Sequence, residues 1–285
     1  MPVTIGTRNS KLALIQANSV KAAFESRGYE VQIKGFTSSG DSNRNVPLYR
    51  MSSTGVFVDE LNEMILKGEI DLAVHSAKDV PTRIQDGLEI TSVIKRDDYR
   101  DVLISETSLE DMREGSVIGT SSMRRIRQVE TANPKIKVSD IRGNIDTRIS
   151  KYMGKKYNGI IIAMAAYNRM SLDIGHFILS EDQFVPAPNQ GIIAIVGKKS
   201  SEPAYASREI NHAETFRDMQ NERFIAGSLN LGCSMPVGIL SSNGKIKTRF
   251  YSLKSNTYKD MEFFNDNMES VIDKIRQEIG DYGYF

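Results

Sequence analysis

Short apolar runs and longer helical patterns follow one another along the first part of the chain. The run "VTI" near the start precedes a helical pattern through "KLALIQANSVKAAFESRG", and "EVQIKGF" is the next extended run. A second helical pattern, "GVFVDELNEMILKG", leads into the compact apolar run "IDLAVHS". Strands that alternate with helices are typical of an α/β fold with a largely parallel sheet.

The spacing of apolar residues predicts which side of each early helix is buried. For the first helix, ended by Gly28, the predicted face consists of Leu12, Ile15, Ser19, Ala22 and Ala23. For the second helix it consists of Phe57, Leu61, Met64 and Ile65. Both sets are expected to pack against the sheet.

The same order of elements returns after residue 115. "SVIGT" predicts a strand that enters a turn, "SSMRRIRQVETAN" a helix ended by Pro134, and "KIKVSDI" a strand. "RGNIDTRISKYMGKKYN" predicts a turn and a helix, and "GIIIAM" a buried strand. Ile5-Gly6-Thr7 and Ile118-Gly119-Thr120 therefore take the same place, at the end of a strand and the opening of a helix. This indicates two similar units.

The pattern changes after the apolar run "GIIAIV". A helix through "ETFRDMQNERFIAG" is followed by a loop, by two expected strands, "KIKTRFYSLK" and "TYKDMEFF", and by an amphipathic helix over roughly 268–279. Strands joined by short polar turns and followed by one helix predict a small α+β domain with an antiparallel sheet. We expect three domains: residues 1–95 with 191–210, residues 98–188, and residues 213–285.

Composition narrows the class of protein. The 285 residues are 40% hydrophobic and 26% charged, as in an ordinary globular protein, and no apolar run reaches the length of a membrane span. The net charge of +1 argues against a generally basic nucleic-acid binder. The start "MPVTIGTRNSKLAL" lacks the pattern of a secretory signal. A single cysteine excludes an internal disulfide, and the three histidines lack metal-ligand spacing. We expect a cytoplasmic protein without a metal.

Arginines and small polar residues gather where predicted strands end. Arg8 lies inside the turn "GTRNS", and "GTSSMRR" and "IRGNIDTR" stand at two further strand ends. Free backbone N–H groups and the positive end of a helix favour anions there, and guanidinium groups suit carboxylates. Ligands of open α/β sheets bind at the carboxyl ends of strands, so these motifs are expected to face one cleft. The alternative for Ser121 or Ser122 is that the side chain caps the following helix.

Asp79 is the only acid in "HSAKDVPTR", which follows the strand "DLAV". One interpretation is a turn or capping residue, since aspartate before Val-Pro is common in turns. The other is a carboxyl group that transfers protons to and from a substrate. His75 is expected to be a hydrogen-bonded residue at the end of the strand.

Cys233, the only cysteine, lies in "LNLGCSMPVG", a segment marked by turn residues. A lone free cysteine usually acts as a small buried hydrophobe. A loop makes little use of such a residue for packing, so a chemical role is the second interpretation.

Six motifs, in order across residues 7–238, carry a family resemblance: "TRNSKLALIQ", "AVHSAKDVPT", "GTSSMRR", "IRGNIDTRISK", "PAPNQG" and "LGCSMPVG". Together they resemble the hydroxymethylbilane synthases, also called porphobilinogen deaminases. No single motif is specific, but their combination and order are.

The resemblance implies a fold and a site. The fold consists of two similar mixed-sheet α/β domains that flank a cleft and resemble type II periplasmic binding proteins, with a small α+β domain at the C-terminus. Cys233 matches the cysteine that holds a dipyrromethane cofactor through a thioether, and Asp79 matches the catalytic aspartate. The positions that match cofactor- and substrate-binding residues are Arg8, Ser10, Lys78, Thr120, Ser121, Ser122, Arg124, Arg125, Arg142, Arg148, Arg169 and Gln190.

The implied reaction condenses four porphobilinogen molecules onto the bound dipyrromethane. Each loses ammonia to give an electron-poor azafulvene, which the free α-carbon of the enzyme-bound pyrrole attacks. Water finally releases the linear tetrapyrrole hydroxymethylbilane. Every added unit brings two carboxylates, so the arginines would screen a charge that grows during the reaction. The family suggests a monomer without nucleic-acid or membrane partners.

The sequence also departs from the family pattern. The loop that usually reads Gly-Gly-Lys-Gly is "SSTG" here, so Thr54 replaces the lysine, and Arg50 is the nearby basic residue. The cysteine is preceded by "LNLG" instead of an acidic, glycine-rich run. Two other classes stay open, a solute-binding protein for carboxylates and a nucleic-acid binder. Neither needs a loop thiol, so a covalent two-pyrrole adduct on Cys233 would separate the synthase from both.

Overall fold

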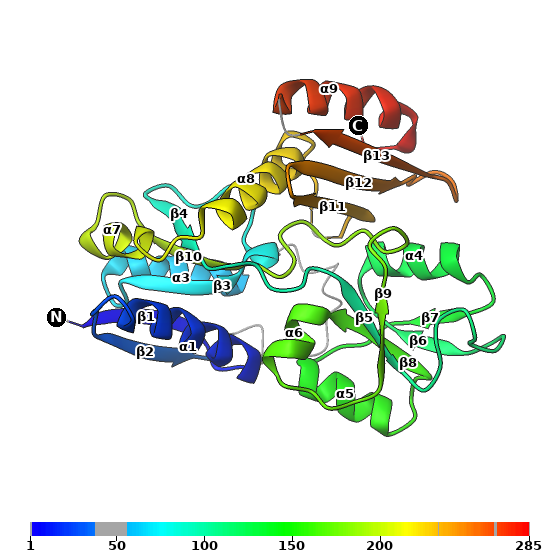
Figure 1. The fold of residues 1–285 in the computed structure, drawn as a ribbon, viewed down its shortest axis with the longest axis horizontal. Coiled ribbons are helices and arrows are strands. Elements are labelled where there is room, and N and C mark those ends of the chain that lie inside the picture. The colour runs from blue at the N-terminus through cyan, green and yellow to red at the C-terminus, as the bar shows by residue number, and fades with distance from the viewer. Residues whose placement is uncertain (1, 38–55, 233, 265–266, 285) are drawn as a thin grey trace. The chain divides into compact units, whose positions relative to one another are not determined.

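The computed structural model describes residues 2–37, 56–232, 234–264 and 267–284. The chain forms two compact units (Figure 1). Unit 1 consists of Met1–Asp97 and Gly191–Gln220, and unit 2 consists of Asp98–Gln190 and Asn221–Phe285.

Unit 1 contains a five-stranded mixed sheet in the order β2-β1-β3-β10-β4. β1 pairs in parallel with β2 and β3, whereas β10 runs antiparallel to both β3 and β4. The strands are β1 (Val3–Arg8), β2 (Val31–Phe36), β3 (Leu72–Ser76), β4 (Leu88–Val93) and β10 (Ile193–Lys198).

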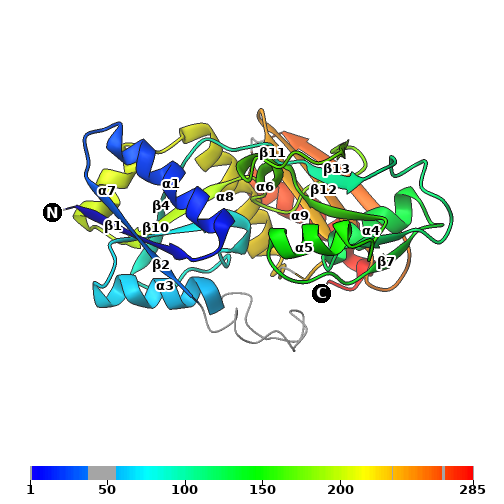
Figure 2. The same ribbon diagram turned by 90° about the horizontal axis from the view of Figure 1, so that it is seen from below.

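Helices cover both faces of this sheet. α1 (Lys11–Glu25) packs with Ile5 and Val74, and α3 (Val56–Lys67) packs with Ala73 and Val196 on the opposite face (Figure 2). α7 (Glu202–Arg208) contacts β4 and β10. The predicted inner face of α1 is wrong, because Ser19 and Ala22 are exposed. The buried residues are Gln16, Ala17, Val20 and Phe24. The polar side chain of Gln16 can be buried because its amide donates a hydrogen bond to Ser76 Oγ at 2.9 Å.

Unit 2 contains a second five-stranded mixed sheet, in the order β7-β6-β8-β5-β9. β6 pairs in parallel with β7 and β8, and β5 runs antiparallel to β8 and β9. The strands are β5 (Asp101–Ser105), β6 (Val117–Gly119), β7 (Lys137–Ser139), β8 (Gly159–Ala163) and β9 (His176–Leu179).

The second sheet is also covered on both faces (Figure 1). Val129 of α4 (Met123–Ala132) packs with Leu103, Ile118 and Ile161. The other face, with Val102 and Ile160, meets α5 (Ile145–Met153) and α6 (Met164–Arg169).

The two sheets have the same topology. In each sheet, the strand that comes first in the chain among three parallel neighbours, β1 or β6, lies between the other two. An antiparallel strand then follows on one side: β10 pairs with β3, and β5 pairs with β8. β1 and β6 correspond, so Ile5-Gly6-Thr7 and Ile118-Gly119-Thr120 do occupy equivalent places. This confirms the expected fold class, including the mixed sheets that the family resemblance implies. The largely parallel sheet inferred from strand–helix alternation alone is wrong.

A three-stranded antiparallel sheet forms the C-terminal part of unit 2, where α9 (Met268–Ile279) lies across it (Figure 1). Its core also includes Ile225 from the last turn of α8 (Ala213–Ser228) and Leu229, which directly follows that helix. The sequence predicts β12 (Lys245–Tyr251) and β13 (Tyr258–Phe264) but misses β11 (Val237–Ser242). This separate core supports the division into three domains, which stays a prediction.

Candidate functional site

Arg8 and Ser10 lie where β1 ends and α1 begins, although Arg8 belongs to the strand and not, as predicted, to the turn. Arg8 is the last residue of β1 and is half-buried. Ser10 is the N-cap of α1, and its hydroxyl accepts a hydrogen bond from Ala13 N at 3.3 Å. Ser10 therefore stabilises the helix start, which also exposes backbone N–H groups to any anion bound beside Arg8.

Asp79 ends a short turn at the carboxyl end of β3. Residues Ala77–Asp79 form one turn of 3-10 helix, tied to the next strand by a hydrogen bond from Ala77 N to Ile192 O at 2.9 Å. The N-cap of the turn is Ser76, so Asp79 is not a capping residue. Asp79 is exposed and Lys78 is half-buried. The geometry leaves the Asp79 carboxyl group accessible, as proton transfer requires.

His75 precedes this turn and is only 7% exposed. Within the described residues its Nε2 has no hydrogen-bond partner, so the expectation of a hydrogen-bonded histidine is not met. Burial, together with the positive charge of Arg8, lowers the pKa of His75 to about 4. The imidazole is therefore neutral at pH 7 and lacks the acidic second proton that an imidazolium would donate.

In unit 2, hydrogen bonds join the turn after β6 to the turn after β7. Thr120 N donates to Ser139 O at 3.0 Å. The Ser121 hydroxyl donates to Ile141 O at 2.6 Å and accepts from Ile141 N at 3.2 Å. Ser122 is the N-cap of α4, but its side chain makes no capping hydrogen bond. Side-chain capping by either serine is therefore not observed, and Ser121 instead fixes the two turns to each other.

The second of these turns carries Arg142, and the first turn of α5 carries Arg148; both are half-buried. Arg142 Nε lies 3.0 Å from Asp140 Oδ2, and Arg148 Nε donates to Gly143 O at 2.8 Å. Gly143 has a φ of 103°, a conformation that favours glycine. Unit 2 thus brings the "GTSSMRR" and "IRGNIDTR" motifs together where β6 and β7 end. Arg169, in the last turn of α6, is half-buried as well.

Arg124 and Arg125 are buried, unlike Arg142 and Arg148. Arg124 Nη1 lies 2.7 Å from Asp101 Oδ2, and Arg125 Nη2 lies 2.7 Å from Asp101 Oδ1. Gln190 Nε2 also donates to Asp101 Oδ1, at 2.8 Å. Burial alone would raise the pKa of Asp101, but the two guanidinium groups outweigh it and hold the pKa well below its usual range. Asp101 is thus ionised, and we name this set of four residues the Asp101 cluster.

Sequence reasoning missed two buried acids. Asp101 begins the otherwise apolar strand "DVLIS". A charged residue at the start of an apolar run is the sequence signal that could have identified it. Glu222 is fully buried in α8, where its carboxylate accepts hydrogen bonds from the backbone N–H of Asn189 and, at 2.8 Å, from that of Ser241. Glu222 thereby fixes the "PAPNQG" loop, which contains Gln190, to β11.

Cys233, Arg50 and Thr54 lie outside the described residues. The residues beside Cys233 belong to the connection between α8 and β11, where Leu231 N donates to Ala226 O at 2.8 Å and Met235 N to Gly232 O at 3.0 Å. A connection between two elements is consistent with the predicted loop.

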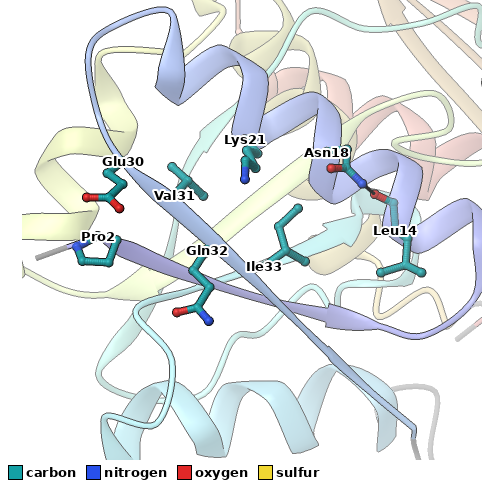
Figure 3. Close-up of a pocket in the computed structure, with 8 residues that line it drawn as sticks. All are labelled: Pro2, Leu14, Asn18, Lys21, Glu30, Val31, Gln32 and Ile33. Carbon is teal, nitrogen blue, oxygen red and sulfur yellow. Dashed lines mark hydrogen bonds between the residues drawn. The ribbon is translucent and has the colours of Figure 1, made fainter.

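A surface pocket in unit 1 includes only Leu14 from the motifs quoted above (Figure 3). It lies between α1 and the edge strand β2, and none of the predicted site residues lines it. The lining residues are Pro2, Leu14, Asn18, Lys21, Glu30, Val31, Gln32 and Ile33.

Among the described residues, no three His, Cys, Asp or Glu side chains gather closely enough to hold a metal ion. The helices in this part of the chain are all too short or too polar to cross a membrane.

Comparison with known sequences gives a match over most of the chain. Residues 3–206 match the family model described as porphobilinogen deaminase, dipyromethane cofactor binding domain. A probable porphobilinogen deaminase of Picrophilus torridus is 56% identical over 284 residues, which cover 100% of both chains. A protein of Thermoplasma acidophilum with the same description is 44% identical and covers 99% of this chain and 98% of its own.

Solved structures with a similar arrangement include periplasmic proteins. A substrate-binding protein of an ABC transporter from Coxiella burnetii is 13% identical, with a TM-score of 0.46 over 75% of this chain and 93% of that one. The methionine-binding protein MetQ is 13% identical, with a TM-score of 0.45 over 79% of this chain and 96% of that one.

Proposed function

The chain belongs to the porphobilinogen deaminase family of transferases, and we propose that it is a hydroxymethylbilane synthase that joins four porphobilinogen molecules into a linear tetrapyrrole. The observation that carries this proposal is the 56% identity to a probable porphobilinogen deaminase along the whole chain. The exposed Asp79 in its turn at the end of β3 and the arginine-bearing turns of unit 2 support it.

The residues of unit 2 fit a carboxylate-bearing cofactor such as dipyrromethane. The Asp101 cluster contains two guanidinium groups and one carboxylate, so it holds an excess of positive charge. Arg142 and Arg148 add two more cations at the edge of the same sheet. When bound, dipyrromethane supplies the nucleophilic α-carbon to which porphobilinogen is joined. Cys233 would hold it through a thioether, since it is the only thiol of the chain.

Asp79 would handle the protons of the condensation. Porphobilinogen loses its aminomethyl nitrogen as ammonia, which requires a protonated amine, and the new carbon–carbon bond requires loss of a proton from a pyrrole α-carbon. An exposed carboxyl group can donate the first proton and accept the second, and its negative charge favours a cationic pyrrole. His75 does not serve this purpose at pH 7, because it is neutral and buried.

The remaining predicted residues would bind and orient the carboxylates of cofactor and substrate. Half-buried guanidinium groups can form paired hydrogen bonds to a carboxylate, and backbone N–H groups at the starts of α1 and α4 favour negative charge. The proposed binding residues are Arg8, Ser10, Lys78, Thr120, Ser121, Ser122, Arg124, Arg125, Arg142, Arg148, Arg169 and Gln190. We further propose a cytoplasmic monomer, which only the family resemblance supports.

The test is incubation of the purified protein with porphobilinogen. We expect one ammonia for each porphobilinogen consumed and one linear tetrapyrrole for every four. Absence of both products, with a folded protein, would contradict the proposal.

A further inference from the structure

Asp101 is the centre of a buried hydrogen-bond network in unit 2. Its Oδ2 accepts from Arg124 Nη1 at 2.7 Å. Its Oδ1 accepts from Arg125 Nη2 at 2.7 Å, from Arg125 Nε at 3.2 Å and from Gln190 Nε2 at 2.8 Å. The side chain is fully buried, at the first residue of β5. One carboxylate therefore fixes three side chains, all of which match ligand-binding positions of the family.

The network fixes the two guanidinium groups to different degrees. Arg125 donates through all three of its nitrogens, because Nη1 also bonds to Ile161 O at 3.0 Å. Arg124 bonds to Asp101, to Gln128 Oε1 at 2.8 Å and to Val185 O at 3.0 Å through Nη1 alone. Arg124 Nε is buried and, in the described part of the chain, has no hydrogen-bond partner. The Arg124 Nε–H of the Asp101 cluster is thus a donor without an acceptor among the described residues.

The charges of the Asp101 cluster do not balance. Arg124 is 2% exposed and Arg125 is 7% exposed, so two positive charges are buried against one negative charge. Among the described residues, Asp101 is the one carboxylate whose charge acts appreciably on Arg124. An unbalanced buried charge costs stability, and an anion bound to the cluster would offset that cost. The excess charge points to an anion from outside the chain.

We propose that Asp101 is a positioning residue for ligand binding, which holds Arg124 and Arg125 in fixed orientations and leaves one positive charge of the pair for a carboxylate of the bound pyrrole chain. This inference rests on the proposed function and names the ligand class of the cluster. It also assigns Asp101 a role that neither the motifs nor the comparisons give it.

The test uses Asp101→Asn and Asp101→Glu, with Asp98→Asn as the matched control. Asn keeps the size of the side chain but removes its charge, whereas Glu keeps the charge but moves it by one methylene. Asp98 lies three residues earlier and pairs with Arg100 at 2.6 Å, but its side chain is 22% exposed. Four quantities are measured for each protein: the thermal unfolding temperature, the fraction that carries a two-pyrrole adduct by intact mass, and the KM and kcat for porphobilinogen.

We expect both Asp101 variants to lower adduct loading and to raise KM at least about tenfold, the size expected when a hydrogen bond to a charged group is lost. The kcat of the loaded fraction should stay within about threefold, and Asp98→Asn should match the unaltered protein. A purely electrostatic role would leave Asp101→Glu normal, and a purely structural role would lower the unfolding temperature with normal loading and KM.

Either of these patterns would overturn the inference. So would failure of both Asp101 variants to fold, since the cluster would then serve the fold alone. If the unaltered protein carries no adduct and does not consume porphobilinogen, the proposed function itself fails, and that result is distinct from the others.

Discussion

The imidazole of His75 and the guanidinium group of Arg8 belong to neighbouring parallel strands and to the same face of the unit 1 sheet. β1 and β3 pair Ile5 with Leu72 and Gly6 with Ala73, so the register extended by two residues brings Arg8 opposite His75. Side chains two residues apart along a strand lie on the same face of a sheet. His75 and Arg8 therefore lie on the face of the unit 1 sheet that α3 covers. A neutral His75 avoids repulsion between the two groups.

This relationship predicts how stability depends on pH. The pKa of His75 is about 4 in the folded chain and 6.5 when unfolded, so between these values only the unfolded state binds the proton. Stability is therefore full above pH 6.5 and falls as the pH drops to 4, by about 3 kcal/mol in total. Chemical denaturation between pH 4 and 7 should show this loss in the unaltered protein but not in His75→Gln. Equal slopes for both proteins would contradict it.

Asp79→Asn should abolish most of the activity without destabilising the protein. The amide keeps the shape but cannot transfer a proton, and a positioned acid–base group typically contributes ~10²–10⁴-fold. Because Asp79 is exposed and caps no helix, the unfolding temperature should hardly change. Ammonia release and thermal unfolding would be measured on one preparation, with the exposed Asp86→Asn as control. Turnover within about threefold of the unaltered protein would remove Asp79 from the mechanism.

Arg142→Leu and Arg8→Leu should stall chain elongation. Each removes a guanidinium group at the end of a strand, and the carboxylates of the growing chain would lose a partner. Intact-mass analysis during turnover should show partly extended species accumulating in both variants. Arg27→Leu, at an exposed position after α1, should behave normally. If Arg8→Leu and Arg142→Leu kept full activity, both arginines would be ordinary surface groups.

Glu222→Gln should destabilise the protein by on the order of 2 kcal/mol. The buried carboxylate accepts two backbone N–H groups, and an amide would direct its own N–H₂ toward one of them. Urea unfolding followed by circular dichroism would measure the loss. Glu214→Gln, at an exposed position in the first turn of α8, is the control. Equal midpoints for the two variants would show that Glu222 does not hold the "PAPNQG" loop to β11.

The sequence predicts the strand–helix order over residues 3–76 and 117–163 and the final helix because local periodicity determines these elements. It leaves β4, β5, β9, α6 and α7 unassigned. It misses β11 because the reason for that strand is a distant contact. A side chain at Gly238 would lie 2.6 Å from Val185 O, and Ile239 N donates to Pro186 O at 2.9 Å. Glycine weakens a strand pattern in the sequence, yet here the close approach of another segment requires it.

The functional site can likewise be predicted from the sequence only where local motifs determine it. Motifs locate Asp79 and the arginines of the turns, since these lie directly after predicted strands. They do not reveal that Arg124 and Arg125 share Asp101, because the partner lies more than twenty residues earlier in the chain. The buried Gln16 is a similar case, since a polar residue in a helical pattern gives no sign of its bond to Ser76.

The most direct test of the central claim is the intact mass of the purified protein beside that of Cys233→Ser. If Cys233 anchors the cofactor, the unaltered protein carries a covalent adduct of two pyrrole units, and brief exposure to porphobilinogen adds further units one at a time. Cys233→Ser should remain folded, unmodified and inactive. Ser234→Ala should retain the adduct. An unmodified mass for the unaltered protein after exposure to porphobilinogen, or the same adduct on Cys233→Ser, would show that Cys233 is not the cofactor anchor.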